Sequence, residues 1–289
     1  MKTPSLTRRD FVRMGAAAAA LSAGGARLAA EARHVPVGLQ LYSVRSLMPK
    51  DLAGTLDAVR RDGYTVVEAA GYYGRTATEF RHALDSARLR CVSAHYTLKL
   101  LETQLDQWIE YSRRLGLEYM VCSSSGGMHR NPNATGPKTL DDWRWIAGQF
   151  NKVGEKIKAA GMTFGVHNHT PEFATLDGVL VYDELLRLTD PKLVVFEMDC
   201  GWVYASGHNP VDYLSKTPER FPLLHVKDMI LLPGGKTHTP VLGKGKVDYP
   251  AIFRAATGLK YYFVEQEQFD MPVIEELKLD ADYCRRLNV

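Results

Sequence analysis

Phe164-Gly165-Val166-His167-Asn168-His169 is a short apolar run that ends in side chains able to bind a metal ion. Each of four such segments predicts a buried strand whose last residues are polar. Strands that all end in His, Asp or Glu indicate a ring of ligands at one mouth of a barrel. The other three segments are Val195-Phe196-Glu197-Met198-Asp199, Leu223-Leu224-His225-Val226-Lys227-Asp228 and Phe263-Val264-Glu265-Gln266-Glu267.

The whole chain repeats a strand–helix unit. Its strands are continuous apolar runs, which are typical of a parallel sheet covered by helices. Gly63, Gly116 and Gly161 follow predicted helices and fit C-terminal caps. Eight units favour a closed (β/α)8 barrel. The alternative, an open doubly wound sheet, usually has a Gly-rich loop after its first strand, where this chain has Tyr42-Ser43-Val44-Arg45.

The predicted strands are 35–42, 65–69, 91–95, 119–123, 163–167, 193–199, 223–227 and 261–265. The predicted helices are 52–62, 78–88, 101–115, 140–160, 181–189, 211–216, 249–256 and 272–287, and residues 124–137 form a predicted long loop.

The N-terminus has the features of an export signal. An arginine pair, Arg8-Arg9, precedes an Ala-rich apolar run, and Ala30-Glu31-Ala32 supplies a small-x-small cleavage site. This order resembles a twin-arginine signal, so we expect residues 1–32 to be removed by export and residues 33–289 to form one catalytic barrel. The expected location is the periplasm or the medium, and the expected partner is the twin-arginine translocation machinery.

The composition limits the partners of the remaining domain. Residues 1–32 hold five of the 36 Lys and Arg and two of the 33 Asp and Glu, which leaves 31 of each and no net charge. A neutral domain gives no reason to expect nucleic acid. The chain lacks the roughly 18 consecutive apolar residues of a membrane span, so we expect no stable membrane insertion. The four cysteines form no CxxC pair, and the first three, Cys91, Cys122 and Cys200, lie in or beside predicted strands and are expected to be buried thiols.

Three of the strand ends predict a metal site. Residues two apart on a strand share a face, so Asp199, His225 and Glu265 can all point inward. Carboxylate and imidazole ligands suit Mn²⁺, Co²⁺, Zn²⁺ or Mg²⁺, and the absence of cysteine ligands argues against a structural zinc site. A lone strand-end histidine is usually structural, and only the recurrence on successive strands favours a metal.

A set of motifs extends from Val37-Gly38-Leu39-Gln40-Leu41-Tyr42-Ser43 to Val264-Glu265-Gln266. Others are Ser93-Ala94-His95, His167-Asn168-His169 with Glu172-Phe173, Asp199 with Trp202, Gly207 to Pro210, His225-Val226-Lys227-Asp228 and Leu242 to Tyr249. Together they resemble the sugar phosphate isomerase/epimerase family, which has a xylose isomerase-like TIM barrel. The resemblance implies a divalent metal, Mn²⁺ first, held by a Glu, Asp, His, Glu set.

Asp199, His225 and Glu265 match the last three of these ligands, but the fifth strand has His167 where the family has Glu. In the epimerases that glutamate also transfers a proton, so its loss argues against a mechanism with two carboxylates. His-Asn-His at this place is similar to the branch with keto-inositol dehydratases and keto-glycoside enzymes. Whether His167 or His169 is the fourth ligand stays open.

We expect Glu265, His169 and Lys227 to act in catalysis, and Glu68, His95 and Trp202 to bind the substrate. The alternatives are that Glu68 caps a helix, Trp202 belongs to the core and Lys227 pairs with Asp228. Glu172 is expected to orient a histidine. Glu197 either does the same or closes the barrel interior.

The leading hypothesis is a metal-dependent isomerase or epimerase of a sugar or keto-sugar that forms an enediolate next to a carbonyl. The second is a lyase or hydratase on keto-glycosides or keto-inositols with the same metal site. A non-catalytic sugar-binding barrel is a third, and a DNA-repair endonuclease is disfavoured by the neutral charge. Export argues against a phosphorylated substrate, and the oligomeric state, a homo-oligomer included, stays open.

Overall fold

The computed structural model describes residues 35–136 and 138–287. The predicted export signal, residues 1–32, lies outside this range. Within the described residues, no helix is both long and apolar enough to cross a membrane.

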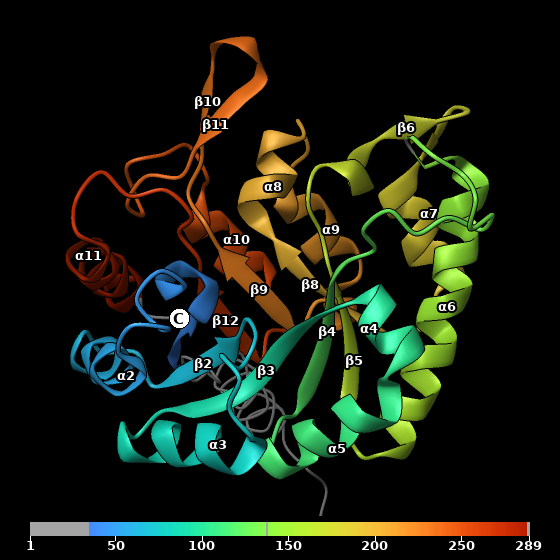
Figure 1. Cartoon of the computed structure of the whole chain (residues 1–289). Helices are drawn as coiled ribbons and strands as arrows, with labels where there is room; N and C mark the ends of the chain where they lie inside the picture. Colours follow the sequence, from blue (N-terminus) through green and yellow to red (C-terminus); the bar gives the residue numbers. More distant parts are fainter. Residues whose placement is uncertain (1–34, 137, 288–289) are drawn as a thin grey trace, which may run out of the picture. The chain divides into compact units, whose positions relative to one another are not determined.

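Eight parallel strands close into a barrel, as predicted (Figure 1). Around the barrel the order is β1, β12, β9, β8, β5, β4, β3, β2, so each strand pairs with the next barrel strand in sequence and the last pairs with the first. The strands are β1 (Val37–Gln40), β2 (Val66–Ala69), β3 (Arg90–Thr97), β4 (Tyr119–Ser124), β5 (Thr163–His167), β8 (Val194–Asp199), β9 (Leu223–Val226) and β12 (Tyr261–Val264).

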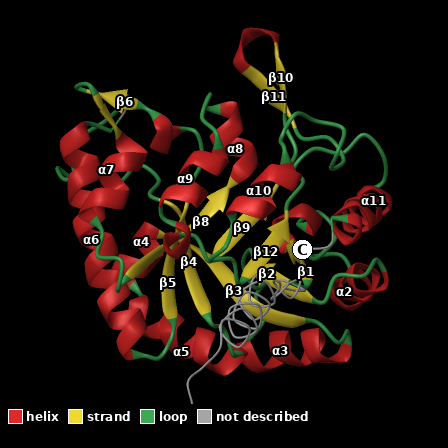
Figure 2. Cartoon of the chain, turned by 180° about the vertical axis from the view of Figure 1, so that it is seen from behind, coloured by secondary structure: helices red, strands yellow, loops and turns green. Residues whose placement is uncertain are grey.

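Helices surround the strands (Figure 2). They are α2 (Leu52–Arg61), α3 (Ala77–Ser86), α4 (Leu98–Thr103), α5 (Leu105–Leu115), α6 (Leu140–Ala159), α7 (Val181–Leu188), α8 (Cys200–Ala205), α9 (Pro210–Lys216), α10 (Tyr249–Ala255) and α11 (Val273–Arg286). Several start at side-chain caps that the sequence contains. Thr139 and Asp142, for example, form a reciprocal capping box at the start of α6.

The glycines predicted to end helices are confirmed in that role. Gly63, Gly116 and Gly161 have φ values of 103°, 86° and 84°, a left-handed conformation that side chains other than glycine rarely adopt. Each one turns the chain from a helix toward the next barrel strand.

The predicted helix 101–115 is wrong in its extent, because the structure has two helices there, α4 and α5. The Thr97 side chain accepts a hydrogen bond from the Leu100 N–H and starts α4 earlier than expected. Gln104, with φ −140°, separates the two helices. The first strand is also shorter than predicted, since Leu41–Val44 forms a 3₁₀ turn after β1.

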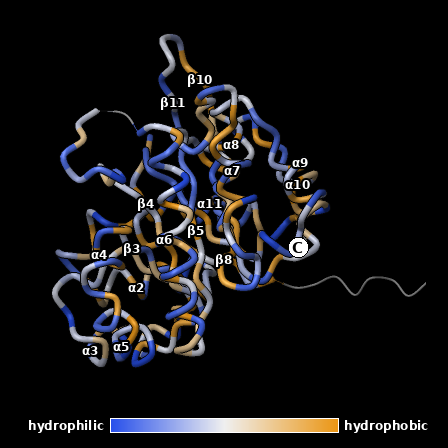
Figure 3. Tube along the Cα trace, turned by 90° about the vertical axis from the view of Figure 1, so that its right-hand side faces the viewer, coloured by the Kyte–Doolittle hydropathy of each residue, from blue (hydrophilic) through white to orange (hydrophobic). Residues whose placement is uncertain are grey.

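Two short hairpins were not predicted: β6 (Thr175–Leu176) with β7 (Val179–Leu180), and β10 (Ile230–Leu232) with β11 (Lys236–His238). The second extends beyond the ends of β8 and β9 in Figure 1. Coloured by hydropathy, β10 is largely apolar and β11 polar (Figure 3).

Apolar side chains fill the lower part of the barrel. Val66, Val92, Val121, Leu223 and Phe263, from five strands, pack together with no more than 3% exposure. Two residues further along the chain from Val66, Leu223 and Phe263 stand Glu68, His225 and Glu265. Because alternate strand residues share a face, these polar residues form the next layer, at the C-terminal ends of the strands. The site therefore stands on an apolar floor.

Candidate metal centre and active site

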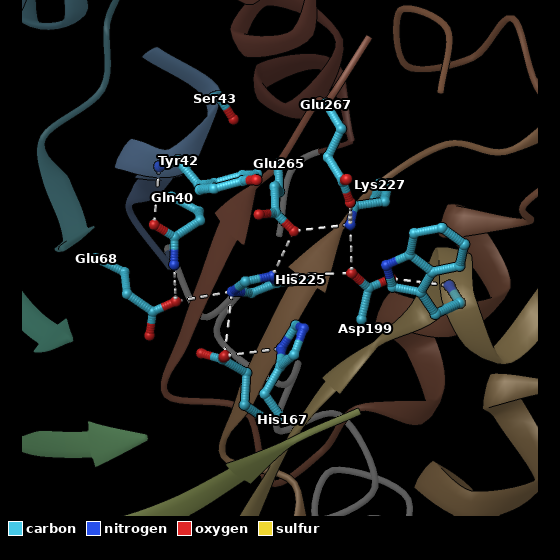
Figure 4. A network of polar contacts seen from close by, with 12 residues as sticks. Gln40, Tyr42, Ser43, Glu68, His167, Asp199, His225, Lys227, Glu265 and Glu267 are labelled. Carbon is cyan, nitrogen blue, oxygen red and sulfur yellow. Dashed lines mark hydrogen bonds and ion pairs between the residues drawn. The ribbon is translucent and has the colours of Figure 1, made fainter. Parts of the chain in front are cut away.

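The predicted site residues come together at the C-terminal mouth of the barrel, and Figure 4 shows Glu68, His167, Asp199, His225, Lys227 and Glu265 among them. Strand register aligns them: β5 pairs His167 with Glu197, and β8 pairs Asp199 with His225. Neighbours in register on parallel strands point to the same side of a sheet. Glu68 on β2, His95 on β3 and Glu265 after β12 complete the ring.

The first cluster, here called the outer group, consists of His167, Asp199, His225 and Glu265. Each offers one ligand atom, these atoms all lie within 4.8 Å of one another, and all four residues are buried. His225 Nδ1 faces this group, 3.1 Å from Glu265 Oε2 and 3.8 Å from Asp199 Oδ2. The four residues that the sequence predicts as metal ligands therefore converge.

The Lys227 ammonium lies beside the outer group. Its Nζ is 3.0 Å from Asp199 Oδ2, 2.8 Å from Glu265 Oε2 and 2.5 Å from Glu267 Oε1. Burial alone would lower the pKa of Lys227, but the three carboxylates outweigh burial and raise it above its ordinary value. Lys227 is therefore a buried cation that does not pair with Asp228.

Asp228 has a structural role instead. Its carboxylate accepts backbone hydrogen bonds from Met229 and from three residues of the loop that precedes α10, which are Gly243, Gly245 and Val247.

A second cluster, here called the inner group, joins Glu68, His95 and Glu197. His95 Nε2 lies 2.9 Å from Glu68 Oε1 and 2.7 Å from Glu197 Oε2. His225 Nε2 joins the same two carboxylates at 2.8 and 3.1 Å. Burial lowers the pKa of His95, but the charges of Glu68 and Glu197 outweigh burial and raise the pKa to about 9. Burial lowers the pKa of His225 as well, but Glu197 and Glu265 outweigh burial and raise it above its ordinary value. In the metal-free protein two imidazolium ions therefore balance two buried carboxylates, and a metal ion on His225 Nδ1 would displace the proton there.

The charges and donor atoms decide which group suits a metal ion. In the outer group and its surroundings, Asp199, Glu265 and Glu267 face one ammonium, which leaves a formal charge of −2. Asp199 Oδ2 is buried and accepts no hydrogen bond of good geometry from the described part of the chain, although Lys227 is near. Burial lowers the pKa of His167 well below its ordinary value, and a neutral imidazole is the form that binds metal. The outer group therefore fits a divalent cation.

His169 and Trp202 lie at the rim of the site. Burial, with Lys227 second, lowers the pKa of His169 to about 4, so its imidazole is neutral near pH 7. The Trp202 ring centroid is 5.9 Å from that of His169, and Lys227 Nζ lies 4.9 Å from the Trp202 ring. The backbone N–H of His169 donates a hydrogen bond to Glu172 Oε2, with 2.9 Å between nitrogen and oxygen. The sequence led us to expect that Glu172 orients a histidine.

Glu68 does not cap a helix. It is fully buried and accepts hydrogen bonds from Gln40 Nε2 at 2.6 Å and from Ser93 Oγ at 2.5 Å. Gln40 and Ser93 were not predicted as site residues. A signal was available, since Gln40 is a polar residue within the apolar run 35–42, but its partner depends on the pairing of β1 with β2.

Comparisons with known proteins agree with this architecture. An inosose dehydratase of Clostridium beijerinckii is 27% identical over 237 residues, which cover 71% of this chain and 78% of that protein. A solved sugar phosphate isomerase/epimerase of Parabacteroides distasonis is 29% identical with a TM-score of 0.73, over 87% of this chain and 98% of the other. The IOLI protein, solved with a bound zinc atom, is 12% identical with a TM-score of 0.66, over 87% and 97%, and shares the fold. Residues 56–287 match the family model described as xylose isomerase-like TIM barrel, and the chain therefore belongs to that family.

Proposed function

We propose that this protein is a metal-dependent enzyme that removes a proton next to the carbonyl group of a keto-sugar or keto-inositol. The observation that carries the proposal is an acid beside a base on a candidate cation site. The Lys227 ammonium and the Glu265 carboxylate are 2.8 Å apart, and Glu265 belongs to the outer group. Proton removal and proton donation can therefore take place on one bound molecule.

His167, Asp199, His225 and Glu265 would hold the ion, with Mn²⁺ the first candidate and Co²⁺, Zn²⁺ or Mg²⁺ the alternatives. When bound, a divalent ion acts as a Lewis acid toward a carbonyl oxygen and orients the neighbouring hydroxyl.

The side chains of the chain supply the proton transfers. Glu265, or the neutral imidazole of His169, takes the proton from carbon. Lys227 donates a proton to an oxygen that leaves, or to the oxygen that becomes a hydroxyl. The Trp202 ring offers a flat apolar face for the sugar, and Glu68 and His95 would meet its hydroxyl groups at the inner side.

Elimination is the outcome that we favour. The base takes the carbon-bound proton, a carbon–carbon double bond forms, and the β-hydroxyl group leaves as water with the proton from Lys227. The fifth strand supplies His167 in place of a second proton-transferring carboxylate, which supports this outcome. Relatives named inosose dehydratase support it too.

Isomerisation or epimerisation is the second candidate, favoured by the similarity to solved sugar phosphate isomerase/epimerases at 26% and 29% identity. In that case the proton returns to a carbon atom and no group leaves. Both outcomes share the first step and the same residues.

Product analysis separates the two. The Mn²⁺-loaded protein is incubated in D₂O with a keto-inositol, a 3-keto-glucoside and a free ketohexose, and the products are followed by NMR. Elimination predicts loss of water or of the glycosidic group, with an enone signal. Isomerisation predicts isomers of the substrate that have lost no group and carry deuterium. A sugar that binds without any exchange would instead support a non-catalytic binding barrel.

We also propose that the twin-arginine machinery exports the protein to the periplasm, on the strength of Arg8-Arg9 and the Ala-rich run that follows. An unphosphorylated substrate fits this location. The test is cell fractionation of the full chain and of a variant with both Arg8→Lys and Arg9→Lys. Export predicts that only the unchanged chain reaches the periplasm, and equal distributions would contradict it.

A further inference from the structure

One carboxylate oxygen beneath the candidate metal centre contacts three imidazole rings. Glu197 Oε2 lies 2.7 Å from His95 Nε2, 3.1 Å from His167 Nδ1 and 3.1 Å from His225 Nε2. Glu197 itself is fully buried. It stands two residues before Asp199 on β8, one layer closer to the apolar floor.

We propose that Glu197 is a positioning residue that sets which ring nitrogens of His167 and His225 face the metal. One oxygen atom that faces three ring nitrogens acts as their shared acceptor, so the nitrogens that face it, His167 Nδ1 and His225 Nε2, carry hydrogens. The opposite nitrogen of each ring is then turned toward the outer group. This inference rests on the metal site of the proposed function and deepens it.

For His225 the orientation of the ring carries the assignment, because both of its nitrogens face carboxylates in the metal-free protein. Its Nδ1 lies 3.1 Å from Glu265, an outer-group residue, while its Nε2 faces Glu197 and Glu68. Figure 4 shows the ring of His225 between Glu68 on one side and Glu265 and Asp199 on the other. Histidines that bind metals commonly donate their second ring N–H to a carboxylate, which fixes the tautomer and the ring orientation.

The geometry of His167 agrees. Its Nδ1 pairs with Glu197, and within residues 35–136 and 138–287 its Nε2 makes no hydrogen bond. The register between β5 and β8 brings the two side chains together, because His167 and Glu197 are direct partners across the two strands.

A role in closing the barrel alone would not require a carboxylate. Glu197 Oε1 is buried and has no hydrogen-bond partner among the residues that the structure describes, so one of the two carboxylate oxygens is unsatisfied there. A buried charge with an unsatisfied oxygen costs free energy that an apolar residue of similar size would not. The three histidine contacts of Glu197 Oε2 give a reason why a carboxylate stands at this position.

The test uses Glu197→Gln, which keeps the side-chain volume and removes the charge. Its matched control is Asp142→Asn, which disrupts another buried histidine–carboxylate pair, His129 Nδ1 with Asp142 Oδ2 at 3.0 Å. Mn²⁺ binding by calorimetry should weaken about 10- to 100-fold in Glu197→Gln and stay unchanged in Asp142→Asn. Thermal unfolding of metal-free Glu197→Gln should occur at a lower temperature, because the two imidazolium ions lose one of the two carboxylates that balance them. Circular dichroism checks that the variant stays folded at the temperature of the binding measurement.

A second measurement needs no variant. In ¹⁵N NMR of the metal-free wild-type protein, His167 should carry its hydrogen on Nδ1. A hydrogen on Nε2 would overturn the inference, and so would wild-type Mn²⁺ affinity in Glu197→Gln. If the wild-type protein bound no divalent ion, the metal site of the proposed function would fail, while the NMR signal would still decide the role of Glu197.

Discussion

Lys227 presents its ammonium to three carboxylates, and two of these, Asp199 and Glu265, belong to the outer group. A divalent ion on the same carboxylates would be repelled by the ammonium. Lys227→Met removes this charge and keeps an unbranched side chain. We expect Mn²⁺ to bind about tenfold more tightly, by the lost repulsion, and turnover to fall about 10²- to 10⁴-fold, the usual contribution of an acid–base group. Calorimetry and kinetics measure the two effects, and weaker Mn²⁺ binding would contradict this account of Lys227.

Trp202 is the residue that we expect to affect substrate binding rather than turnover. Its ring stands over Lys227 Nζ at 4.9 Å and close to His169. Trp202→Leu removes the flat face, and we expect KM to rise about tenfold, the equivalent of one lost stacking contact, with kcat nearly unchanged. Trp202→Phe should restore much of the affinity. A fall in kcat at constant KM would instead assign Trp202 to the transition state.

The convergence of the four candidate metal ligands could be predicted from the sequence because each ends an apolar strand with a polar side chain. His167, Asp199, His225 and Glu265 required only that the strands close into a barrel. The hydrogen-bond partners were harder to predict. Glu68 meets Gln40, 28 residues away, and Glu197 meets His95, 102 residues away, through strand register that local sequence does not encode.

At the scale of elements, barrel closure between β1 and β12 depends on Gly38. A Cβ atom at this position would lie 2.4 Å from the Tyr262 carbonyl oxygen and 2.7 Å from Phe263 Cδ1. We expect Gly38→Ala to lower the free energy of unfolding by about 1–3 kcal/mol, as overpacking does. The matched control is Gly148→Ala in α6, where a Cβ would meet no atom of the described residues within 4 Å and the change should be neutral or stabilising by up to about 1 kcal/mol. Chemical denaturation of both variants measures the difference, and equal stabilities would contradict the tight contact.

The strand–helix alternation was predictable because long apolar runs and terminal glycines mark it strongly. The break between α4 and α5 was not, since it depends on the Thr97 cap and on a single non-helical residue, Gln104. The β10–β11 hairpin was missed for a related reason. Its strands have three residues each, which is too short for a periodic pattern to indicate them.

At the scale of the whole molecule, stability should depend on pH through Asp280 in α11. Burial raises the pKa of this carboxyl group to about 7, from 3.8. The folded state therefore binds a proton more tightly than the unfolded state. Its contribution to stability is complete below pH 3.8 and is lost as the pH rises through about 7.

Asp280→Asn keeps an acceptor for the Leu242 N–H, which Asp280 binds at 2.7 Å, and removes the titration. We expect the variant to exceed the metal-free wild type by about 1–3 kcal/mol at pH 8 and to lose that advantage at pH 4. Thermal or urea unfolding at the two pH values measures it. A constant difference between variant and wild type would contradict a raised pKa.

The same ring of strand ends that closes the barrel mouth gives the molecule its proposed chemistry, and solvent hydrogen exchange tests it most directly. The Mn²⁺-loaded protein and its Asp199→Asn variant are incubated with keto-inositol in D₂O, and deuterium next to the carbonyl is measured by NMR. The account predicts rapid incorporation by the wild type, and loss of both exchange and Mn²⁺ binding in the variant. Exchange that is unchanged in Asp199→Asn, or absent from the wild type with every keto-sugar tried, would contradict it.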